Sequence, residues 1–247
     1  MSDTVLAETV RITGHEGAEI EAYVARPLGV DRHGSVILIH HLPGYDAATK
    51  EMARRFATMG HAALLPNLYS RQAPGREPGE AAAVVREQGG VPDEQLIGDV
   101  AGAATALRRL PASNGKVGCI GHCSGGRQSF LAACSVDLDA AVDCYGAFVV
   151  GTLPDGFPLR VEPLYDRIPD LRCPVLGLFG ADDQHPSVED DHELERLCAR
   201  HGKDFSMKIY DGASHAFFFT GRDSYRADAA IDGWARIEEF FGRHLTT

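Results

Sequence analysis

A glycine-bracketed cysteine is the feature of this chain best suited to chemistry. The stretch Gly121-His122-Cys123-Ser124-Gly125-Gly126 follows an apolar run at 116–120 and precedes a helical pattern. This is the setting of the Gly-x-Ser-x-Gly nucleophile elbow, here with Cys123 at its centre. The sharp strand-to-helix turn needs glycine two residues before and two after the nucleophile, because neighbouring backbones approach closely there. The amide dipoles of a helix N-terminus favour a thiolate, so we predict Cys123 as the nucleophile. Ser124 is not predicted as the nucleophile, because a motif centred on Ser124 would need glycine at position 122, where this chain has His122.

Two later apolar runs end in residues that could complete a triad. The run Pro174–Phe179 leads into Gly-Ala-Asp182-Asp183, and Phe205–Tyr210 leads into Asp-Gly-Ala-Ser-His215. Nucleophile, acid and base in this chain order, each after a strand, are typical of α/β-hydrolases. We therefore predict one of the two aspartates as the acid and His215 as the base.

Alternating strand and helix patterns would position these residues. Apolar runs predict strands, and spacing of three to four residues predicts helices. We expect strands at 5–13, 20–26, 35–40, 62–65, 116–120, 140–145, 174–179 and 205–210, and helices at 47–59, around 96–107, and at 128–134, 187–200 and 228–243.

This pattern predicts an α/β fold. Apolar strands separated by amphipathic helices favour a mostly parallel sheet with helices on both faces. The first two strands are more nearly alternating and predict an antiparallel hairpin at the sheet edge. The Pro- and Gly-rich stretch Gln72–Gly79 reads as a loop too short to link two domains, so we expect a single α/β-hydrolase domain spanning 1–247.

Composition excludes several other classes of function. With 24 Lys and Arg against 35 Asp and Glu, the net charge is −11, which disfavours binding to nucleic acid or to an anionic membrane. The first residues, Met1 to Val5, lack the basic start and apolar segment of a secretory signal, so we expect a cytoplasmic protein. The six cysteines form no CxxC pair, and apart from Cys123 we expect them to be packing residues rather than disulfides or zinc ligands.

From about residue 5 to residue 243 the chain resembles the dienelactone hydrolase family. The features that carry the likeness are the elbow, Gly44, Gly60, Pro66–Arg71, Tyr145-Gly146 and Gly212–Phe217. The resemblance implies hydrolysis of a lactone or small carboxylic ester through a thioester, without a cofactor or metal. It assigns Cys123 as nucleophile, His215 as base and Asp183 as acid, because the family's acid lies three residues after the strand-ending glycine. It also implies an oxyanion hole formed by the backbone N–H groups of Ser124 and Leu42.

Two departures from the family pattern bear on the substrate. The family's third strand ends in His-Glu, where this chain has His40-His41, and we predict that His41 hydrogen-bonds the thiol or the substrate at the mouth of the site. The family also binds its substrate's carboxylate with two arginines. Arg71 matches the first, but the second position is Phe219, with Arg222 three residues beyond. A more apolar ester or lactone is therefore expected.

The resemblance further suggests substrate contacts from Tyr145 and Phe217. Two other functions remain open at this stage. His40 and His41, with His122 or an aspartate, could bind a metal for metal-assisted lactone hydrolysis, although adjacent strand residues point to opposite faces. The chain could also be a noncatalytic binding module or thiol redox sensor. The expected partner is a small-molecule substrate, and the expected assembly is a monomer or homodimer.

Overall fold

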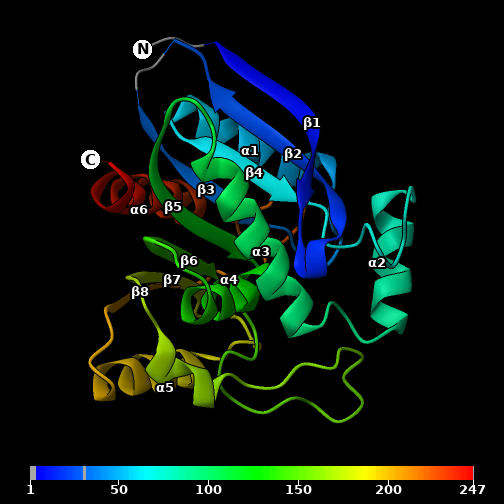
Figure 1. The fold of residues 1–247 in the computed structure, drawn as a ribbon. Helices are drawn as coiled ribbons and strands as arrows, with labels where there is room; N and C mark the ends of the chain where they lie inside the picture. The colour runs from blue at the N-terminus through cyan, green and yellow to red at the C-terminus, as the bar shows by residue number, and fades with distance from the viewer. Residues whose placement is uncertain (1–3, 30–31, 247) are drawn as a thin grey trace.

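One eight-stranded sheet forms the centre of the molecule (Figure 1). The computed structural model describes residues 4–29 and 32–246. The first three residues, on which the expectation about a secretory signal partly rests, lie outside this range. Within the described residues, no helix is long and apolar enough to cross a membrane.

The strands follow the order β1-β2-β4-β3-β5-β6-β7-β8. β1 pairs with β2 and β2 with β4 in antiparallel register, and every other neighbouring pair is parallel. The predicted α/β fold and edge hairpin are therefore confirmed. The strand bounds are β1 Val5–Thr13, β2 Glu19–Pro27, β3 His33–Ile39, β4 Ala62–Pro66, β5 Ser113–His122, β6 Ala140–Cys144, β7 Val175–Gly180 and β8 Phe205–Tyr210.

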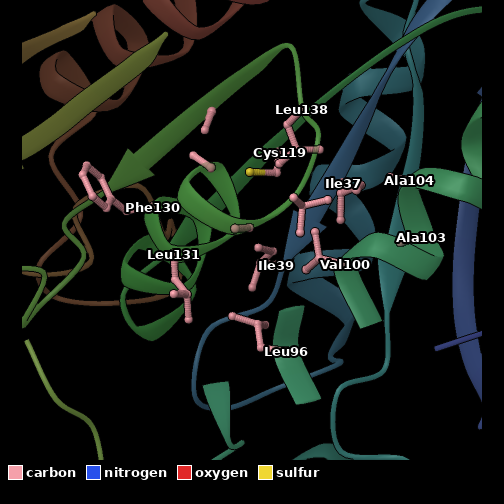
Figure 2. Close-up of a cluster of buried hydrophobic side chains, with 14 of the residues drawn as sticks. Ile37, Ile39, Leu96, Val100, Ala103, Ala104, Cys119, Phe130, Leu131 and Leu138 are labelled. Atoms are coloured by element: carbon pink, nitrogen blue, oxygen red, sulfur yellow. The ribbon is translucent and has the colours of Figure 1, made fainter. Parts of the chain in front are cut away.

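Helices cover both faces of the sheet, and alternating strand side chains feed the two cores. In β3, Val36 and Leu38 pack beneath α1 and α6, whereas Ile37 and Ile39 pack beneath α3 and α4. Figure 2 shows Ile37 and Ile39 among Leu96 and Val100 of α3 and neighbouring residues. The helix bounds are α1 Ala47–Thr58, α2 Pro78–Glu87, α3 Asp93–Arg108, α4 Ser124–Ser135, α5 Val188–Arg200 and α6 Ala227–Leu245.

Three of the described elements escaped sequence-based prediction, the first being a short 3-10 helix at His15–Gly17 in the hairpin connection. Helix α2 begins at Pro78, inside the stretch read as a loop, because proline fits the first turn of a helix, where its missing N–H costs nothing. A short 3-10 helix spans Tyr165–Asp170. Helix α4 also begins four residues earlier than predicted, at Ser124, so that the helix starts immediately after Cys123.

The turn between β5 and α4 is as tight as the elbow motif requires. A Cβ on Gly121 would lie 1.8 Å from the carbonyl oxygen of Gly125, and a Cβ on Gly125 would lie 2.4 Å from that of Ile39. Both contacts are with backbone atoms, which cannot move aside as a side chain can. The two glycines therefore set how closely the nucleophile turn packs on the sheet.

Gly121→Ala is expected to destabilise the protein by about 2 kcal/mol or more, because the added methyl group forces the turn away from the sheet. The free energy of unfolding from urea denaturation measures this effect. Gly242→Ala is the matched control, because nothing lies within 4 Å of its added Cβ in helix α6 and alanine favours a helix by about 1 kcal/mol over glycine. Equal stability of the Gly121→Ala protein and the unaltered protein would contradict the packing argument.

Candidate active site

The carboxyl ends of four parallel strands meet at one pocket of about 360 Å³. Leu42 follows β3, Cys123 follows β5, Asp183 follows β7 and His215 follows β8, and all four line this pocket. Parallel strands present their carboxyl ends at the same sheet edge, so residues far apart in the chain converge there. The volume suits a small molecule.

Asp183 holds His215 in a defined orientation. The Nδ1–H of His215 donates to Oδ2 of Asp183 over 2.7 Å, and the backbone N–H of His185 donates to Oδ1 of Asp183 over 3.0 Å. The side chain of Asp183 is 4% exposed. The neighbouring Asp182 is exposed, and its N–H bonds to the carbonyl of Ala213. Of the two candidate acids, Asp183 is therefore the one that contacts His215.

Cys123 lies in a strained turn beside this pair. Its backbone φ of 58° and ψ of −125° are unfavourable for a residue with a side chain, as expected at an elbow. Burial raises the pKa of a thiol, but here His215 and the N–H groups of Ser124 and Leu42 outweigh burial, and the pKa of Cys123 is lowered. Burial lowers the pKa of His215, but hydrogen bonds to Asp183 and Cys123 raise it to about 10. This electrostatic balance favours a thiolate–imidazolium pair.

Alkylation of Cys123 by iodoacetamide is expected to persist below the pH at which a free cysteine stops reacting. Since the pKa of the thiol is lowered, the thiolate is lost only when the pH falls through that lowered value. Mass spectrometry of the alkylated protein gives the rate at each pH. In His215→Ala the midpoint should rise, because the N–H groups of Ser124 and Leu42 alone then oppose the effect of burial on the pKa of the thiol. A midpoint at or above that of free cysteine in the unaltered protein would contradict the geometry.

The two departures from the family pattern lie against each other. The His41 ring stacks on Phe219 with centroids 4.5 Å apart, and its Nε2 bonds to Oδ2 of Asp46 over 2.9 Å. His41 is 4% exposed and does not line the pocket. His41 therefore does not lie at the mouth of the pocket, as we predicted, but stacks on Phe219 and hydrogen-bonds Asp46. Arg222 is exposed, and its guanidinium lies 5.9 Å from the Phe219 ring.

Arg71 also lies outside the pocket lining. Its two terminal nitrogens donate to the two carboxylate oxygens of the buried Asp99, over 2.7 and 2.6 Å. This bidentate pair occupies the guanidinium that the resemblance assigned to the substrate. The placement of Arg71 therefore gives no support to its predicted role.

Tyr145 and Phe217 are core residues next to the site. Both are fully buried and absent from the pocket lining. The Tyr145 ring packs edge-on against His215 with centroids 5.1 Å apart, and Phe217 packs against Tyr145 at 5.2 Å. Their placement therefore gives no support to the predicted substrate contacts. Tyr145 contacts the base His215 directly, and Phe217 packs on Tyr145.

The far wall of the pocket consists of residues that sequence reasoning missed. They come from α2, the segment after it, α4 and the long connection after β6, and they include Val85, Val91, Arg127, Phe148, Phe157, Leu159 and Val161. Phe148 and Phe157 pack edge to face at 4.8 Å. One signal for this wall is present in the sequence. A group of apolar residues without strand or helix periodicity follows β6, which ends at the active-site edge of the sheet. The wall makes the pocket predominantly apolar.

Two of the three histidines proposed as metal ligands, His40 and His41, hydrogen-bond other groups. The Nδ1–H of His40 donates to the carbonyl of His41, and its Nε2 accepts the N–H of Leu68. Burial lowers the pKa of His40 to about 4 and that of His122 to about 3, so both rings are neutral. Over residues 4–29 and 32–246, no three His, Cys, Asp or Glu side chains are grouped as a metal site would need.

Comparison with known proteins decides the family. Residues 20–245 match the model of the dienelactone hydrolase family. The chain belongs to the dienelactone hydrolase family. Like this family of ester and lactone hydrolases, it is a hydrolase.

Relatives within the family agree over nearly the whole chain. A candidate carboxymethylenebutenolidase of Methylorubrum extorquens is 33% identical over 97% of this chain and 82% of its own length. One from Escherichia coli is 31% identical over 93% of this chain and 84% of its own length. The crystal structure of a candidate dienelactone hydrolase from Klebsiella pneumoniae superposes with a TM-score of 0.86 at 29% identity, covering 97% of this chain and 99% of that one.

Proposed function

We propose that this dienelactone hydrolase family member cleaves lactones or small carboxylic esters through Cys123, His215 and Asp183, with a thioester intermediate. The observation that carries the proposal is the 2.7 Å hydrogen bond that Nδ1–H of His215 donates to Asp183. This bond leaves Nε2 of His215 to act on the thiol of Cys123, whose pKa His215 lowers. A carboxylate, imidazole and thiol coupled in this way form an activated nucleophile. No cofactor is required for these steps.

The acylation half-reaction follows from these contacts. The Cys123 thiolate attacks the carbonyl carbon, and the carbonyl π electrons move to oxygen. The N–H groups of Ser124 and Leu42, which already act on the sulfur, would donate to this oxyanion. Tyr69 supports the second donor, since its hydroxyl donates to the carbonyl of Leu42 over 2.8 Å. Collapse of the intermediate breaks the carbon–oxygen bond, and the alkoxide leaves with the proton of His215 Nε2.

Deacylation reverses the roles. The now neutral His215 takes a proton from water, whose oxygen attacks the thioester carbon, and the thiolate of Cys123 leaves. Asp183 stabilises the imidazolium of His215, which is present at rest and forms again during deacylation, and it keeps Nε2 directed at the thiol.

Partitioning with methanol tests for the shared acyl-enzyme. Phenyl butyrate and 4-nitrophenyl butyrate should give the same ratio of methyl butyrate to butyrate at a fixed methanol concentration, because both pass through one butyryl thioester. Gas chromatography measures the ratio. Ratios that depend on the leaving group would exclude the thioester, and absence of turnover for these esters and for simple lactones would exclude the hydrolase function as proposed.

A further inference from the structure

We infer that this pocket selects uncharged substrates, and that the ion pair of Arg127 with Asp93 determines this selectivity. The inference rests on the proposed function and names its substrate class. It also separates this chain from what the relatives' name, carboxymethylenebutenolidase, describes, since that name specifies a butenolide with a carboxymethylene group.

Arg127 is the one arginine or lysine among the described residues that line the pocket. It lies in the first turn of α4, four residues after Cys123, and both residues line the pocket. A guanidinium at this position would be well placed to bind a substrate carboxylate if its donors were available.

Both terminal nitrogens of Arg127 already have hydrogen-bond partners. Its terminal nitrogens donate to both carboxylate oxygens of Asp93 over 2.9 and 3.0 Å, and one of them also donates to the carbonyl of Glu162 over 2.7 Å. Its Nε–H has no partner among the described residues but is enclosed by protein atoms. The side chain is 4% exposed. A ligand therefore meets a neutralised cation rather than a free one.

The same contacts hold the apolar wall in place. Asp93 is the first residue of α3, and Glu162 belongs to the connection that supplies Phe157, Leu159 and Val161 to the pocket. By bonding to both, Arg127 fixes this connection against α3. A carboxylate entering the pocket would lose its hydration and meet apolar side chains. The two cations that line the pocket are already paired, Arg127 with Asp93 and His215 with Asp183.

Neither of the family's two positions for a carboxylate-binding arginine supplies a cation to the pocket. Arg71 lies outside the pocket and is paired with Asp99. The position of the family's second arginine holds Phe219, which is stacked on His41. The lack of a free arginine at both positions favours uncharged substrates, as does the pairing of Arg127 with Asp93.

A matched pair of esters tests the inference directly. 4-Nitrophenyl pentanoate and mono-4-nitrophenyl glutarate have five-carbon acyl chains that differ in ending with a methyl group or a carboxylate. We expect kcat/KM for pentanoate to exceed that for the hemiglutarate by about 100-fold, because an uncompensated charge is costly to bury. Comparable values for the two esters would overturn the inference while leaving the proposed function intact. Failure to cleave either ester would instead count against the proposed function.

Two variants test the role of the ion pair. Asp93→Asn releases the Arg127 guanidinium and should raise kcat/KM for the hemiglutarate about tenfold, since charge-assisted hydrogen bonds become available. Asp137→Asn makes the same charge change beside the surface residue Arg108 and should leave the ratio of the two substrates unchanged. An unchanged ratio in folded Asp93→Asn would overturn the assignment to this pair.

The double variant Arg127→Gln/Asp93→Asn covers the case in which Asp93→Asn alone does not fold, and it leaves no unpaired Asp93 carboxylate beside the pocket. Glutamine can still donate to the carbonyl of Glu162 but carries no charge. The hemiglutarate should remain the poorer substrate, with kcat/KM no lower than in the unaltered protein, because the charge of Arg127 was not available to it. A tenfold fall confined to the hemiglutarate would mean that the guanidinium binds the carboxylate, contrary to the inference.

Discussion

Cys123→Ala is expected to lower kcat/KM for 4-nitrophenyl butyrate by about 10,000-fold, because removal of a nucleophile leaves only binding and oxyanion stabilisation. The loss should appear in kcat, since the sulfur forms its bond only during the reaction. Initial rates of nitrophenolate release measure both constants, and circular dichroism confirms that the variant is folded.

Cys173→Ala is the matched control for loss of a thiol. Cys173 is buried in the core and does not line the pocket, and burial raises the pKa of its thiol to about 12. Its replacement should leave kcat/KM within about twofold, as expected for a small packing change outside the site. Undiminished ester cleavage by folded Cys123→Ala would remove the proposed mechanism.

Asp183→Asn is expected to lower kcat by about 1,000-fold or more, because the carboxylate both orients His215 and stabilises its protonated form. The asparagine amide can present an N–H to Nδ1, which would favour the wrong tautomer of the histidine. The variant should also raise the pKa of the Cys123 thiol, a change that iodoacetamide alkylation across pH detects. This second readout separates loss of the histidine's orientation from a general structural disturbance.

The adjacent Asp182→Asn provides the control, since it makes the same chemical change one residue away. Asp182 is exposed and has no bond to His215. Its variant should keep kcat within about twofold. Equal losses in the two variants, or a larger loss in Asp182→Asn, would contradict the assignment of the acid.

Much of the fold could be predicted because each strand and helix carries its own periodicity. Strands β1 and β8 were predicted with their observed bounds, and helix α5 within one residue at its start. The elbow glycines and the order of cysteine, aspartate and histidine after successive strands fixed which residues should meet. Topology then brings them together, because the parallel strands deliver their carboxyl ends to one edge.

The partners of the proposed substrate-binding residues could not be predicted, because they depend on pairs of side chains that form across the fold. Nothing in the local sequence indicates that Arg71 forms an ion pair with Asp99, or that Phe219 stacks on His41. Family positions locate a residue in the chain but not its partner when that partner has changed. Arg127 illustrates the reverse case, since it matched no expected position and yet lines the pocket.

The most direct measurement of the central claim is the site of acylation in the enzyme quenched with acid during turnover of 4-nitrophenyl butyrate. Peptide mass spectrometry should find a butyryl group on Cys123, released by neutral hydroxylamine as a thioester is, and absent from Asp183→Asn quenched at the same early time. A butyryl group on Ser124, or rapid turnover by an enzyme that never carries an acyl group on Cys123, would contradict the account.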